Sequence, residues 1–174
     1  METTPEVVQL AEKLAKTYMI GVRKGNPRPA WAHPEDVVAL VKRVPGLRPD
    51  TGTQCFLEAV AWLHDVLEDT TLTEESLHEA GIPDHVIMGV KMLTKASWMT
   101  PHFYFRGVDG APELVKIVKL CDRLANLTEG KGVLPETWWR QYTYEAKHFV
   151  VPMAEDMGEP WKSWLVSKLE AVMV

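Results

Sequence analysis

Apolar residues recur every three or four positions along most of the chain, which is the spacing of one face of an α-helix. The stretch "TTPEVVQLAEKLAKTYM" near the N-terminus shows this pattern, and Thr4 followed by Pro5 is typical of a helix start. The strict alternation of apolar and polar residues that marks a half-buried β-strand is not evident. The sequence therefore predicts an all-α fold.

The same spacing, with proline, glycine and capping residues at the boundaries, predicts a helical bundle of about seven to nine helices. After the first, helices are expected over 34–44, about 54–69, 74–80, 83–95, 111–127, 136–157 and 161–174. Two stretches rich in turn residues, 21–32 and 96–110, are expected to be an irregular loop and a mobile connector. The 174 residues, 46% of them hydrophobic, suit a single domain spanning 1–174.

Charge and hydropathy narrow the range of partners. The formal net charge is −5 and the pI is near 5.7, which disfavours general binding to nucleic acids or anionic membranes. No apolar run approaches the roughly 18 residues of a membrane-spanning helix, and the N-terminus lacks a signal-peptide pattern. We therefore expect a cytoplasmic protein with a small partner, in which Cys55 and Cys121 are buried reduced thiols.

The segment "AWLHDVLEDTTL" places four ionisable residues, His64, Asp65, Glu68 and Asp69, after an apolar run. On a continuous helix that turns by about 100° per residue, these positions share one wedge of roughly 140°. Burying such groups without partners would be costly in free energy. The wedge is therefore expected to face a cavity.

A second apolar helix, 111–127, is interrupted in the same way by Asp122, Arg123 and Asn126. Polar side chains in two central helices favour one shared site between them. His33 lies just before Pro34, at the start of a further helix, and can join that site from a third element.

Two histidines and two aspartates thus form a candidate metal-ligand set: His33, His64, Asp65 and Asp122. Such nitrogen and oxygen donors suit Mn²⁺, Fe²⁺ or Zn²⁺ better than metals that prefer thiolates. The ordinary alternative is a helix-capping histidine and a solvated His–Asp pair. The apolar surroundings of His64 and Asp65 favour the metal site over that alternative.

The order of these residues resembles that of the HD-domain metal-dependent phosphohydrolases. Four segments, "RKGNPRPAWAHP", "HDVLEDT", "GVKMLTK" and "VKLCDRLANL", are similar to the hydrolase domain of RelA/SpoT-type alarmone enzymes and to the small alarmone hydrolases. The resemblance covers about residues 8–157. It implies an HD-domain helical bundle around a central metal site.

The resemblance also implies roles for individual residues. The four candidate ligands would hold one divalent ion, expected to be Mn²⁺, with Fe²⁺, Zn²⁺ or Co²⁺ as alternatives. Glu68 and Asp69 would orient a water molecule and take its proton. Arg23 and Lys24 would flank the base or the phosphates of a nucleotide. The other positions that the resemblance assigns to substrate binding are Asn126, Lys119, Lys95 and Tyr144.

The implied activity is hydrolysis of the 3′-pyrophosphate of (p)ppGpp-type alarmones or an adenosine counterpart, which would relieve starvation-type growth arrest. A variant of it is an antitoxin that opposes a toxic alarmone synthetase, including at a tRNA 3′ end. The alternatives are hydrolysis of a dNTP, a dNMP or the 2′-phosphate of NADPH, and a non-catalytic nucleotide-binding regulatory protein. The intact Glu68–Asp69 pair disfavours the non-catalytic alternative. Tryptophans 138, 139, 161 and 164 suit a core or a subunit contact, so a homo-oligomer is also an alternative.

Overall fold

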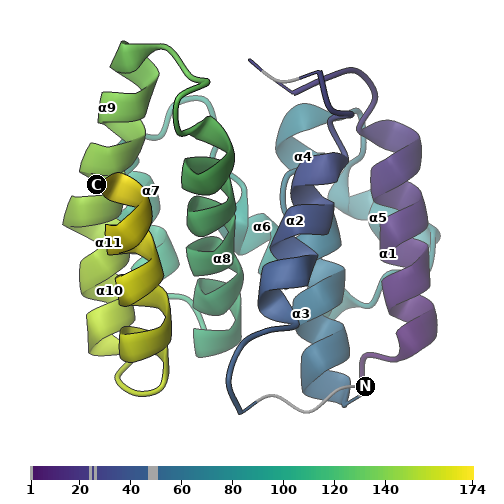
Figure 1. The fold of residues 1–174 in the computed structure, drawn as a ribbon. Coiled ribbons are helices and arrows are strands. Elements are labelled where there is room, and N and C mark those ends of the chain that lie inside the picture. Colours follow the sequence, from purple (N-terminus) through teal and green to yellow (C-terminus); the bar gives the residue numbers. More distant parts are fainter. Residues whose placement is uncertain (1, 24, 26, 47–50) are drawn as a thin grey trace.

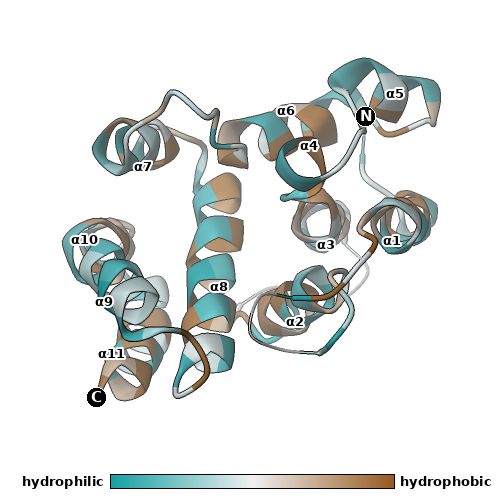
Figure 2. Ribbon diagram, turned by 90° about the horizontal axis from the view of Figure 1, so that it is seen from above, coloured by the Kyte–Doolittle hydropathy of each residue, from teal (hydrophilic) through white to brown (hydrophobic). Residues whose placement is uncertain are grey.

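The computed structural model describes residues 2–23, 25, 27–46 and 51–174. Within these ranges the chain is helical and forms no β-strand, apart from one isolated bridge between Val22 and Pro29. Figures 1 and 2 show α8 lying between two groups of helices, α1–α6 on one side and α7 with α9–α11 on the other. The predicted all-α fold is confirmed.

The α-helices are α1 (Pro5–Tyr18), α2 (Ala32–Val41), α3 (Gly52–Leu63), α4 (Val66–Asp69), α5 (Glu74–Glu79), α6 (Asp84–Leu93), α7 (Pro101–Asp109), α8 (Glu113–Gly130), α9 (Glu136–Glu145), α10 (Val151–Asp156) and α11 (Ser167–Met173). Two π-helical segments, η1 (Ala146–Val150) and η2 (Lys162–Val166), connect α9 to α10 and lead into α11. None of the described helices is both long and apolar enough to cross a membrane.

The stretch 96–110 is not the mobile connector that its composition suggests, because its second half forms α7. The Thr100 side chain accepts a hydrogen bond from the amide of Phe103, and Pro101 occupies the first helical position. Tyr104, Phe105 and Val108 of α7 are buried. Thr100–Pro101 is the same local start signal as Thr4–Pro5, whereas the burial of α7 is tertiary packing that local composition does not reveal.

The helix that ends in His64 also differs from expectation. Helix α3 ends at Leu63, and residues 64–65 form a turn before the short helix α4 begins at Val66. Helix α2 begins at Ala32, so His33 lies inside its first turn rather than at its cap. Of the four ionisable residues, His64 and Asp65 thus lie in the turn, and Glu68 and Asp69 lie in α4.

The core surrounds α3 and α8. Leu57, Val60 and Leu63 of α3 are fully buried, and Leu120 and Leu127 of α8 are almost completely so. Helix α8 packs against α2 and α3 on one side and against α9 and α11 on the other. Polar side chains on such a helix have a fixed position, because the apolar residues on both sides of them are immobilised by packing.

Helices α3 and α6 approach each other closely at Gly89. A Cβ atom on Gly89 would lie 3.0 Å from Cγ2 of Val60 and 3.2 Å from Cζ of Phe56. Gly107 on α7 is different, because a Cβ there would meet no heavy atom within 4 Å. The two glycines therefore test packing and helix propensity separately.

We predict that Gly89→Ala lowers the free energy of unfolding by about 1–3 kcal/mol, the usual cost of overpacking a core. Gly107→Ala should instead raise it by about 0.5–1 kcal/mol, because alanine is the better helix former. Urea denaturation followed by circular dichroism measures both. Equal stabilisation by the two substitutions would contradict the close packing of α3 against α6.

Candidate metal centre

Three buried side chains from α2, the end of α3 and α8 meet at one point. The Nε2 atom of His33 lies 2.9 Å from Oδ1 of Asp122 and 3.2 Å from Nε2 of His64. All three residues are no more than 3% exposed. They approach this point with ring nitrogens and a carboxylate oxygen, the atoms that bind divalent cations.

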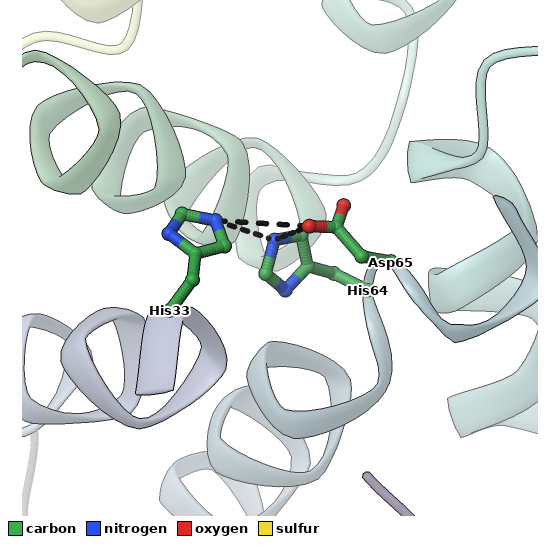
Figure 3. A group of neighbouring side chains, drawn as sticks. All are labelled: His33, His64 and Asp65. Atoms are coloured by element: carbon green, nitrogen blue, oxygen red, sulfur yellow. Dashed lines mark hydrogen bonds and ion pairs between the residues drawn. The ribbon is translucent and has the colours of Figure 1, made fainter. Parts of the chain in front are cut away.

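Asp65 completes the cluster from the turn after α3. Its Oδ2 atom lies 3.3 Å from Nε2 of His64 and 3.7 Å from Nε2 of His33 (Figure 3). Adjacent residues on a regular α-helix point about 100° apart. The change in backbone direction at Asp65, with φ −102° and ψ −4°, instead accompanies the convergence of two neighbouring side chains. The break in the helix is thus part of the site.

The tautomer of His64 is fixed by a backbone hydrogen bond. Its Nδ1 atom lies 2.7 Å from the carbonyl oxygen of Ala61, which can only accept, so Nδ1 is the donor. In the neutral ring, Nε2 then carries a lone pair directed at the cluster. Nδ1 of His33 is buried without a hydrogen-bond partner among the described residues. The Nε2 atoms of His33 and His64 face each other at 3.2 Å, and such a pair of ring nitrogens requires a proton or a cation between them.

The charges around His64 favour a cation at this point. Burial by itself lowers the pKa of His64, but the carboxylates of Asp65 and Asp122 outweigh it and raise the pKa to about 10. In turn, His64 holds the pKa of Asp65 below its usual value despite burial. His33, His64 and Asp65 offer ligand atoms that all lie within 4.8 Å of one another. The donor set therefore fits a divalent metal ion.

A cleft of about 490 Å³ opens beside the cluster, and Asp65 and Asp122 form part of its wall. Six of the other residues predicted from the sequence also line it: Arg23, Glu68, Asp69, Lys95, Lys119 and Asn126. The fold thus brings two of the four candidate ligands, the acidic pair and four candidate substrate contacts to one cavity.

Glu68 lies in this cleft one turn beyond Asp65. Its Oε2 atom accepts a hydrogen bond of 3.1 Å from the backbone amide of Lys95. Burial raises the pKa of Glu68, and the nearby charges of Asp65 and Asp69 add to the effect, against the opposing hydrogen bond. A carboxylate with a raised pKa and a fixed orientation is suited to accept a proton from water near neutral pH.

Arg23 reaches the cleft from the loop that precedes α2. Its guanidinium donates hydrogen bonds of 2.9 and 3.1 Å to Oε2 of Glu129 and one of 3.0 Å to Oδ1 of Asn126. The Asn126 amide in turn donates to Oδ1 of Asp122. A chain of hydrogen bonds therefore joins the loop to the cluster of candidate metal ligands. Lys24, its predicted companion, lies outside the described residues.

Lys119, one turn before Asp122 in α8, contacts the carboxylate oxygen of Asp122 that does not face His33 and Asn126. Its Nζ atom lies 2.7 Å from Oδ2 of Asp122 and 5.1 Å from the centre of the Tyr104 ring. Oδ1 and Oδ2 of Asp122 thus face different partners, the histidines and the lysine. This arrangement fixes the carboxylate and keeps a positive charge beside the cluster.

Tyr144 is not brought to the cleft with the other predicted residues. It is 56% exposed and stacks on His148 at a ring separation of 3.9 Å, whereas Tyr142 lines the cleft. Sequence reasoning also did not assign a role to Arg123 and Glu129, which line the cleft. The available signal for Glu129 was its spacing of seven positions from Asp122, and for Arg123 it was a charged residue within an apolar helix.

Comparisons with known proteins agree with this fold. No protein-family model and no curated protein matches the sequence. Among solved structures, the chain is similar to one described as "A metazoan ortholog of SpoT hydrolyzes ppGpp and plays a role in starvation responses". The TM-score is 0.72 and the sequence identity 21%, and the match covers 96% of this chain and 91% of that chain. The likeness shows that the chain has the fold of that hydrolase.

We predict that adding Mn²⁺ to the metal-free protein raises its melting temperature, because an ion bound only to the folded state stabilises it. A free ion concentration of 100 times Kd corresponds to about 2.7 kcal/mol. His64→Ala should abolish the shift, since it removes a buried ligand. His78→Ala, at an exposed histidine, should leave the shift unchanged. An unchanged Mn²⁺ response in His64→Ala would exclude this cluster as the metal site.

Proposed function

We propose that this protein is a metal-dependent phosphohydrolase that removes the 3′-pyrophosphate from alarmones of the (p)ppGpp type. The observation that carries the proposal is the arrangement of His33, His64, Asp65 and Asp122 at one side of a cleft that also contains Glu68. The likeness in fold to a protein described as hydrolysing ppGpp supports the same activity here.

A divalent ion, which we propose to be Mn²⁺, would supply a Lewis acid that polarises a phosphoryl oxygen and acidifies water. Glu68 would hold the attacking water and accept its proton, with Asp69 beside it in the cleft. Lys119 would offset the negative charge that develops on the phosphoryl group. For ppGpp, addition of one water molecule gives GDP and pyrophosphate.

The opposite end of the cleft suits the nucleoside. Asp122 and Glu129 are seven residues apart on α8, which is about 10 Å along the helix axis. Asn126 lies between Asp122 and Glu129 along α8, and Arg23 donates hydrogen bonds to both Asn126 and Glu129. A flat guanidinium can stack on a purine, and an amide can hydrogen-bond to its edge. We propose that the nucleotide lies along α8 with its 3′-pyrophosphate at Asp122.

The direct test is a substrate panel. The purified protein with Mn²⁺ is incubated separately with ppGpp, ppApp, a dNTP, a dNMP and NADPH, and the products are separated by anion exchange. We expect GDP and pyrophosphate from ppGpp, loss of activity on chelation, and recovery when Mn²⁺ is restored. Release of phosphate or triphosphate from the deoxynucleotides alone would instead identify a deoxynucleotide phosphohydrolase.

Glu68→Gln separates binding from chemistry, because it keeps the shape of the side chain and removes the base. We predict that kcat falls by roughly 10²-fold or more while Mn²⁺ and ppGpp still bind. Glu75→Gln, at an exposed position on α5, is the matched control and should be fully active. Loss of Mn²⁺ binding in Glu68→Gln would mean that Glu68 is a ligand rather than the base.

A further inference from the structure

Arg123 follows the metal-ligand candidate Asp122 on α8 and lines the same cleft. It is only 5% exposed. Its Nη2 atom donates a hydrogen bond of 2.7 Å to Oε2 of Glu145. Nε and Nη1 are buried and have no hydrogen-bond partner in the part of the chain that the structure describes.

The guanidinium of Arg123 is held in place by its neighbours. Its central carbon lies 4.7 Å from the ring centre of Tyr142 and 5.6 Å from that of Phe105. Glu145 also accepts a hydrogen bond of 3.1 Å from the side chain of Gln141. Stacking and the ion pair together fix the orientation of Arg123 before any ligand arrives, which lowers the entropic cost of binding.

Buried N–H groups of a charged side chain are costly when they remain unpaired. Glu145 satisfies one nitrogen, and the other two have no partner among the described residues although the side chain lines the cleft. A ligand that offers several oxygens would complete the hydrogen bonds of this arginine. Phosphoryl groups are the natural match, because their oxygens carry negative charge and a guanidinium presents several donors.

We propose that Arg123 forms a second anion subsite in the cleft, distinct from the group held at Asp122. Its unpartnered N–H groups donate to phosphoryl oxygens of the 5′-diphosphate while the 3′-pyrophosphate lies at the metal-ligand cluster. The inference rests on the proposed function. It makes the preferred substrate a nucleotide that carries phosphoryl groups at both ends of its ribose, and it makes Arg123 a specificity-determining residue.

The test compares ppGpp with guanosine 3′-diphosphate, which lacks the 5′ phosphates. In Arg123→Lys, which keeps the charge, KM for ppGpp should rise roughly 10- to 100-fold with little change in kcat. KM for guanosine 3′-diphosphate should stay within about twofold of the parent value. Arg140→Gln is the matched control, because Arg140 forms a similar pair with Glu136 on an exposed face. It should change neither constant.

Nucleotide binding measured in the Glu68→Gln variant tests the role of Arg123 without requiring hydrolysis. The dissociation constants of both nucleotides, measured by calorimetry with and without Arg123→Lys, should show the same selective weakening for ppGpp. If the parent protein binds ppGpp but does not hydrolyse it, the proposed function fails and the binding comparison still decides the role of Arg123. Equal weakening of binding for both nucleotides, or no weakening, would overturn the subsite. A lower melting temperature of Arg123→Lys together with equal weakening would show that Arg123 has a purely structural role.

Discussion

The site depends on the burial of two imidazoles against two carboxylates at the junction of α2, α3 and α8. His33 and His64 are almost completely enclosed, and their Nε2 atoms face each other at 3.2 Å with Asp65 and Asp122 beside them. Such a cluster is unfavourable in an apolar core unless a proton or a cation sits among the four groups. A divalent ion would pair with the two Nε2 atoms and both carboxylates together, which is why we propose metal binding for this cluster.

Helix α8 connects that cluster to the rest of the cleft, because it supplies Asp122 and several other residues that line the cleft. Its apolar residues hold it between two groups of helices (Figure 2). Lys119, Asp122, Asn126 and Glu129 lie at spacings of three or four residues, so they share one face of this helix. Hydrogen bonds link the residues on this face, since Lys119 and Asn126 both donate to Asp122, and Arg23 donates to both Asn126 and Glu129.

Much of this arrangement could be predicted from the sequence, because periodicity identifies buried helices and polar residues within them stand out. The Thr100–Pro101 start of α7 was visible in the sequence, but the burial of α7 and the break at Asp65 could not be predicted in this way. Contacts between separate segments accompany both, such as the hydrogen bond from the Tyr104 hydroxyl to the carbonyl of Leu93 and the approach of Asp65 to His33. The pairing of Arg123 with Glu145 is a similar case, since 22 residues separate them. Local composition carries no signal for such tertiary contacts.

We propose that His33, His64, Asp65 and Asp122 hold one metal ion. Anomalous diffraction from crystals grown with Mn²⁺, collected on both sides of the manganese absorption edge, locates that ion without reference to any activity. We expect one strong peak within bonding distance of Nε2 of His33, Nε2 of His64 and the carboxylates of Asp65 and Asp122. A well-ordered cluster with no peak there, or a peak coordinated only by other residues, would contradict it.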